Sequence, residues 1–188
     1  MEIHGALHPR LGNRIDTVLD SLQDELFAGT VSYETFSCVY IFLHSLQHFH
    51  WRGLGIRQLT DWCMLLTSGK DIDYNCVKET ISRMGIQPEW DAFYVFCAEW
   101  LGLHPCKALQ QFSSRNCFSS VAQIWQEAKE GGNMGHKHEV KAKSKNIIIR
   151  NILIWIRIFR TYFKHRSISP NASLAKLRQH FSDYCQQL

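Results

Sequence analysis

Apolar residues recur along most of the chain at steps of three and four residues, which is the period of an amphipathic α-helix. Gly29 and Gly85 follow two such segments, and Asp71 or Asp73 stands where a helix N-cap is expected. The pattern predicts helices over about residues 11–27, 32–51, 56–66, 73–84, 88–101, 121–128, 146–166 and 171–187. Only Met1–Leu7 suggests a strand. We therefore expect a mainly α-helical, bundle-like domain with at most a short N-terminal strand.

The chain divides at a stretch of small and polar residues. From Gly131 to Lys145 it reads GGNMGHKHEVKAKSK, which has almost no large apolar side chain and is typical of a flexible linker. We expect a helical domain over residues 1–130, a basic flexible linker over 131–145, and a basic helical pair over 146–188. That pair would pack on the domain or on a partner.

The first helix of the pair, NIIIRNILIWIRIFRTYFKHR, is apolar nearly all round. Its basic residues Arg150, Arg157, Arg160 and Lys164 fall within a narrow stripe at helical spacing. They leave too short an uninterrupted apolar run for a good membrane span. Three interpretations stay open: a helix buried in the core, a docking surface for another chain, and a helix lying in a membrane interface.

Charge is distributed unevenly between these parts. Residues 1–130 carry 10 Lys and Arg against 15 Asp and Glu, whereas residues 131–188 carry 11 against 2. The formal net charge of +4 is therefore the sum of an acidic body and a basic tail. A block this basic can meet nucleic acid, an anionic membrane, or the acidic body of its own chain.

The cysteines indicate a reducing compartment. They number seven, an odd count, and no two are spaced as CxxC: Cys38, Cys63, Cys76, Cys97, Cys106, Cys117 and Cys185. We interpret them as small core residues and not as a disulfide framework. The opening residues MEIHGALHPR contain no basic region followed by an apolar run, so no secretory signal is expected. These features predict a cytoplasmic protein.

The densest polar cluster combines two helical pairs. His44 and His48 share one helix face, and Arg57 and Asp61 share a face of the next helix. A helical His pair can bind a metal, but a metalloprotease of this type needs a Glu directly after the first His, where this chain has Ser45. We interpret the four residues as a buried structural cluster that fixes the angle between two helices, and expect no metal there. A metal-dependent enzyme built on His44, His48 and Asp61 is the weaker alternative.

A second polar stretch, TSGKDIDYN, is similar to the Gly-Ser and Asp-x-Asp with which nucleotidyltransferases hold magnesium. That arrangement needs a strand under the aspartates and a helix between the two motifs, whereas here they abut between helical segments. Helix capping therefore explains Asp71 and Asp73 better. No phosphate-binding glycine loop, nucleophile elbow or dinucleotide fingerprint is present. The six tryptophans stand at helical core spacing, which favours packing over base stacking.

Four short motifs follow one another through the middle of the chain: Phe42-Leu43 with His48, Arg57-x-Leu59-x-Asp61, Ile72-Asp73, and Leu101-Gly102-Leu103-x-Pro105. In this order they resemble the carboxy-terminal helical portion of an uncharacterised nucleotidyltransferase-like family found widely in bacteria. Glu2-Ile3-His4 adds a weaker similarity to the strand that carries this family's third catalytic carboxylate. The resemblance covers roughly half of the chain.

The resemblance implies metal-dependent transfer of a nucleotide from a nucleoside triphosphate, with two metals held by three carboxylates. Only Glu2 matches one of these carboxylates, and the strands that supply the Gly-Ser and the other two would precede it. We therefore expect a helical portion that is inactive alone, packs beside a catalytic lobe, and meets magnesium and nucleotide only if the missing strands are supplied. The alternative is an interaction module whose basic C-terminal helices bind an acidic protein, nucleic acid or membrane surface.

Overall fold

The computed structural model describes residues 11–51, 53–68, 71–103, 118–131, 147–166 and 168–169 of the 188-residue chain. Over these ranges it contains no strand and seven helices: α1 (Asn13–Phe27), α2 (Tyr33–Trp51), α3 (Ile56–Ser68), α4 (Tyr74–Met84), α5 (Gln87–Trp100), α7 (Phe118–Gly131) and α8 (Ile147–His165). The predicted mainly α-helical, bundle-like architecture is confirmed. The suggested strand at 1–7, the linker beyond residue 131 and the last helix at 171–187 lie outside the described residues.

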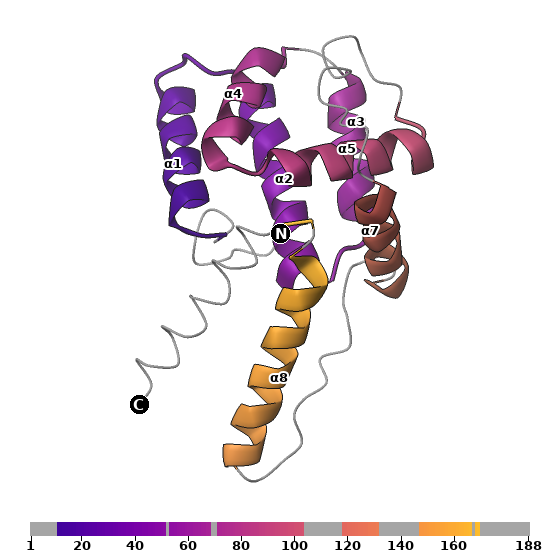
Figure 1. Cartoon of the computed structure of the whole chain (residues 1–188). Coiled ribbons are helices and arrows are strands. Elements are labelled where there is room, and N and C mark those ends of the chain that lie inside the picture. Colours follow the sequence, from indigo (N-terminus) through magenta and orange to yellow (C-terminus); the bar gives the residue numbers. More distant parts are fainter. Residues whose placement is uncertain are drawn as a thin grey trace.

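Helix α2 forms the centre of the bundle. It packs against α1, α3 and α4, while α5 packs against α3, α4 and α7. Figure 1 shows α1 and α3 on opposite sides of α2. Because neighbours surround it, α2 is buried over a wide face, which comprises Cys38, Val39, Phe42, Leu43, Leu46 and Phe49.

The core is built around aromatic rings from three helices. Phe42 of α2 lies 4.8 Å from Trp90 of α5 and 5.4 Å from Trp62 of α3, measured between ring centroids, and the two indoles are 4.9 Å apart. All three side chains are fully buried. Tilted and edge-to-face pairs of this kind contribute about 0.5–1.5 kcal/mol each beyond the burial of their area. The expected packing role of the tryptophans therefore holds for Trp62 and Trp90, whereas Trp100 and Trp125 stack on each other at the surface.

The predicted helix ends of α4 are confirmed. Of the two candidate aspartates, Asp73 is the N-cap, and its carboxylate accepts hydrogen bonds from the amides of Asn75 at 2.9 Å and Cys76 at 3.1 Å. Gly85 ends the helix at φ 72°, a left-handed conformation that glycine adopts without steric cost. Asp71 has a different role, since its carbonyl accepts a hydrogen bond from Ser32 of the turn before α2.

The described cysteines are free thiols. Cys38, Cys63 and Cys97 are buried and Cys76 is half-buried, as expected of small core residues. Cys63 and Cys97 share a hydrogen bond between α3 and α5, which lowers the pKa of the Cys63 thiol and raises that of Cys97 well above its usual value. The thiols therefore contribute to the packing between helices.

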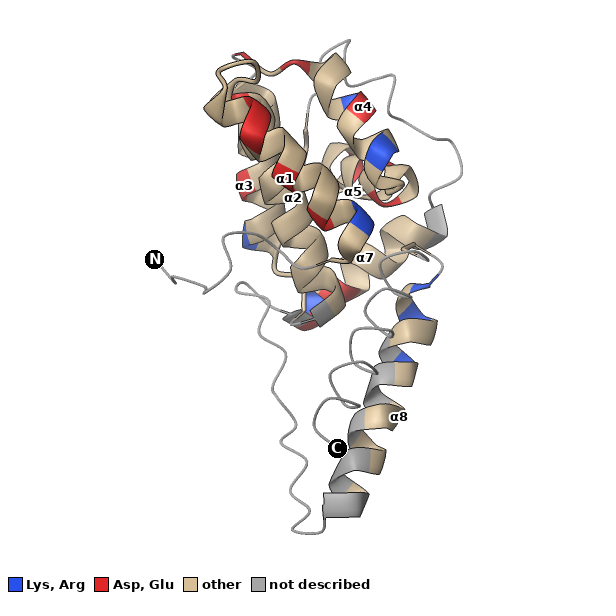
Figure 2. Cartoon of the chain, turned by 90° about the vertical axis from the view of Figure 1, so that its left-hand side faces the viewer, with Lys and Arg blue, Asp and Glu red and all other residues tan. Residues whose placement is uncertain are grey.

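Helix α8 departs from the bundle. Figures 1 and 2 both show it projecting away from the other helices, with only its carboxyl end against them. Six large apolar side chains along it are exposed: Ile149, Ile152, Leu153, Ile156, Phe159 and Phe163. The interpretation of this segment as a helix buried in the core is therefore wrong for the side chains that the structure describes. No helix in the described part of the chain combines the length and apolar character that a membrane span requires.

Candidate functional site

The polar cluster expected at α2 and α3 is not a buried network. The rings of His44 and His48 pack edge to face, with centroids 4.6 Å apart, and both residues are half-buried. Arg57 and Asp61 are exposed on α3. Water can solvate exposed charges directly, so this pair has no need of buried partners. A group of buried polar residues that includes Glu127 and His165 lies elsewhere, at the base of α8.

The expected basic surface on α8 is described in part. Arg150 and Arg157 belong to α8, but the structure does not describe their side chains. Glu2 lies outside the described residues. Arg160 is exposed. Lys164 forms ion pairs with Glu127 and, at 3.6 Å, with Glu130 of α7. At this position the basic tail therefore meets the acidic body of its own chain.

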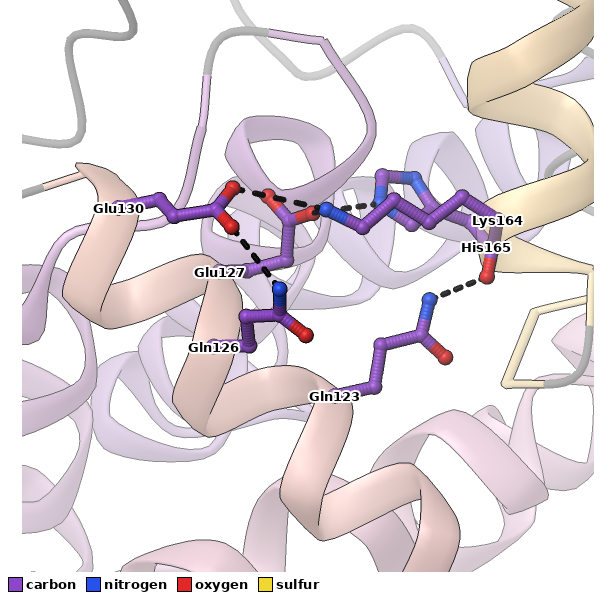
Figure 3. A network of polar contacts seen from close by, with 6 residues as sticks. All are labelled: Gln123, Gln126, Glu127, Glu130, Lys164 and His165. Carbon is purple, nitrogen blue, oxygen red and sulfur yellow. Dashed lines mark hydrogen bonds and ion pairs between the residues drawn. The ribbon is translucent and has the colours of Figure 1, made fainter.

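The base of α8 is fixed by an arrangement that we call the α8 anchor: Glu127 of α7 with Lys164 and His165 of α8. Figure 3 shows the Lys164 ammonium and the His165 ring both pointing toward the Glu127 carboxylate. The His165 ring nitrogen Nε2 lies 3.3 Å from Glu127 Oε1, and Gln123 donates a hydrogen bond to the Lys164 carbonyl. Burial lowers the pKa of Lys164, but the contacts with Glu127 and Glu130 outweigh it, and the net pKa is raised. The ammonium is therefore firmly charged.

The α8 anchor is deeply buried on its carboxylate side. Glu127 is fully inaccessible, and His165 is 2% exposed. The His165 ring stacks on Phe49 of α2 at 4.3 Å and meets the ring of His50 edge to face at 5.4 Å. A buried carboxylate is tolerable only with a charged or hydrogen-bonding partner. The ion pair therefore holds the end of α8 in one position against α7 and α2.

A second buried acid, Glu89 in the first turn of α5, lies near the chain that leaves α8. It is 1% exposed, and burial raises the pKa of its carboxyl to about 7, against the smaller opposing effects of the Ser169 hydroxyl and its own backbone amide. Neither carboxyl oxygen has a hydrogen bond of good geometry among the described residues. Ser169 is itself buried, and its amide donates to the carbonyl of His165 at 2.9 Å. Glu89 is thus a buried acid that can change its charge near neutral pH.

The sequence did not lead us to predict Glu89 and Glu127 as buried acids, although the pattern around each contained a signal. Glu127 follows Ile124 by three residues and so lies on the apolar face of its helix, and Glu89 precedes Phe93 by four. An acid on an apolar helix face is a sign of a buried polar contact. Its partners could not be identified, because Glu127 and His165 are separated by 38 residues.

The arrangement of these residues is better suited to holding the end of α8 in place than to catalysis. Within the described ranges, no group of three or more His, Cys, Asp and Glu residues is placed to hold a metal ion. The α8 anchor joins one carboxylate to one ammonium and one imidazole, which fixes a helix end. Comparison with models of protein families, with curated proteins and with solved structures found no match.

Proposed function

We propose that this chain is the helical portion of a nucleotidyltransferase-like protein, a domain that packs beside a catalytic lobe and does not carry out the chemistry alone. One observation supports the proposal: most of the described residues that carry the resemblance form the core and the turns of a single bundle. Phe42, Leu43 and Leu59 are fully buried, and Leu103 is 3% exposed. A family resemblance in a helical domain is expected at such structural positions.

The turn residues of the motifs have equally definite roles. Asp73 caps α4, and Gly102 has φ 71°, a backbone conformation that residues other than glycine rarely adopt. Arg57 and Asp61 are different, because they are exposed on α3 and neither fills the core nor ends a helix. We assign these two to the surface that faces the catalytic lobe.

The proposal places the metal chemistry outside the bundle. By the resemblance, three carboxylates hold two magnesium ions and the nucleoside triphosphate, and Glu2 is the one candidate for such a carboxylate in these 188 residues. Glu89 and Glu127 are unsuited to this task, because each is buried and the second is already ion-paired. The same proposal includes that the protein acts in a bacterial cytoplasm.

Calorimetric titration of the 188-residue chain with ATP and magnesium tests the claim of inactivity. We expect neither binding heat nor turnover, and turnover by this chain alone would contradict the proposal. The DNA immediately upstream of the Met1 codon tests the claim of a missing lobe. An in-frame Gly-Ser and Asp-x-Asp there would place the lobe in the same protein, and an extended protein that carries them should transfer nucleotide. A ribosome-binding site there would instead place the lobe in a separate protein.

A second candidate function is an interaction module that binds through its C-terminal basic helices. The exposed apolar side chains of α8 favour it, because soluble domains rarely expose large apolar groups in a continuous row without a binding role. Binding to an acidic protein, nucleic acid or anionic vesicles should weaken steeply as salt concentration rises. Gel-shift and flotation assays that show no binding at low salt would remove nucleic acid and membrane as partners.

A further inference from the structure

Five of the six exposed apolar residues of α8 follow a heptad pattern, and the sixth, Leu153, falls by helical register between Arg160 and Lys164. Ile149, Ile152, Ile156, Phe159 and Phe163 succeed one another at steps of three, four, three and four residues, and each is between 45% and 58% exposed. We call these five residues the α8 seam. At 3.6 residues per turn they occupy only roughly 80° of the helix circumference. A seam this narrow, with a strict repeat of three and four, is the surface that pairs with another helix in a coiled coil.

One edge of the α8 seam is basic and the other is aromatic. By helical register Arg160 and Lys164 lie next to the seam on one side, and Trp155 and Tyr162, both half-buried, lie on the other. Arg150 and Arg157 fall on the basic side of the register. The whole helix contains no Asp or Glu. A partner that matches both features needs an apolar seam of its own and carboxylates along one edge.

The base of α8 already shows this chemistry within the chain. Where α8 meets another helix, α7 presents Glu127 and Glu130 to the basic edge at Lys164. Further along α8, Arg160 lies on the same edge and is exposed. A helix that continues the contact along α8 would repeat the pairing of acid with base.

Two other occupants fit less well. A second copy of the chain offers no carboxylate from its own α8, so two such helices would bring only cations together. An anionic bilayer is an extended plane and would also approach the bundle, where residues 1–130 carry 15 acids against 10 bases. Figure 2 shows acidic residues over the bundle. A single helix can contact the α8 seam alone and avoid this repulsion.

We propose that the α8 seam binds an amphipathic α-helix of another protein, which lies along α8 with its apolar residues on the seam and an acidic edge against Arg160. This inference deepens the second candidate function and is independent of the nucleotidyltransferase proposal. Its failure would leave the expected ATP and magnesium results unchanged.

The test measures fluorescence anisotropy of a labelled helical peptide with the full chain. The acidic peptide has about three heptads, with Leu at the a and d positions and Glu at the flanking positions, and its control has Lys in place of Glu. The seam variant is Ile152→Glu with Ile156→Glu. The matched control is Phe27→Glu with Met64→Glu, which makes the same kind of change at exposed apolar positions on α1 and α3. Circular dichroism confirms that all proteins are folded.

We expect the acidic peptide to bind the unmodified chain and the Phe27/Met64 control alike, and to lose about tenfold or more in affinity for the seam variant. The Lys peptide should bind far more weakly. Equal binding of both peptides, or no binding of either, would overturn the proposal. Vesicle binding or dimerisation that the seam variant abolishes, without peptide binding, would assign the seam to a membrane or to a second copy.

Discussion

Replacement of Glu89 by Gln tests the electrostatics at the base of α8. The folded protein holds this carboxyl at a pKa of about 7, whereas the ordinary value is 4.5, because burial disfavours the charged form. A pKa raised in the folded state means that the unfolded chain gives up its proton first as pH increases. Glu89 therefore contributes stability that is complete below its ordinary pKa and is lost as pH rises towards 7.

The size of the effect follows from the pKa difference. Each unit corresponds to about 1.4 kcal/mol, so ionisation of Glu89 should cost the folded state about 3 kcal/mol once the pH is above 7. Gln has nearly the same shape as the protonated acid and never ionises. Glu89→Gln should therefore match the original chain in stability near pH 4 and exceed it by about 3 kcal/mol near pH 8.

Urea unfolding at a series of pH values measures the difference, with tryptophan fluorescence as the signal. Other titrating groups are shared by the two proteins and cancel in the comparison. Ser169→Ala is a useful companion variant, because loss of the hydroxyl that faces Glu89 should raise the pKa of this acid further. A stability difference that does not change with pH, or a Gln variant that is less stable near pH 8, would contradict a raised pKa for Glu89.

Three further substitutions test individual contacts by thermal or urea unfolding. Lys164→Met should lower the free energy of unfolding by about 2–3 kcal/mol, because it leaves the buried Glu127 carboxylate without its ammonium partner. Glu127→Gln should lower it by less, and the opposite order would contradict the α8 anchor. Asp73→Ala should lower stability by about 1 kcal/mol through loss of the α4 N-cap, and Asp73→Asn should restore most of it. Gly102→Ala should lower the free energy of unfolding by about 1 kcal/mol through backbone strain at φ 71°, because a Cβ there would meet no other atom. Gly102→Asn should lower it by less, and equal effects of the two substitutions would exclude backbone strain as the cause.

Local patterns in the sequence predicted most of the described helices. The three- and four-residue repeat located the helices, since burial of one helix face imposes that period whatever the neighbours are. The ends of α4 at Asp73 and Gly85 could be predicted because helix caps depend on residues only a few positions away. The basic stripe of α8 could also be predicted from the sequence, but the exposure of its apolar residues could not.

The candidate site depends on contacts between distant segments, which patterns along the chain do not predict. A polar cluster was expected where His44, His48, Arg57 and Asp61 are close in sequence, yet the last two are exposed. The buried cluster joins α7 to the end of α8, which are separated by the expected linker. Whether a largely apolar helix is buried or exposed depends on how the whole bundle packs, and its own composition cannot decide this.

Hydroxyl-radical footprinting of the full chain measures directly whether α8 leaves the bundle with its apolar seam open to solvent. Phe159 and Phe163 should be oxidised at rates close to that of Phe27, which is 76% exposed, and far faster than the fully buried Phe42 and Phe93. If the two α8 phenylalanines were as protected as Phe42, the seam would be covered by the chain itself and could not be a docking surface.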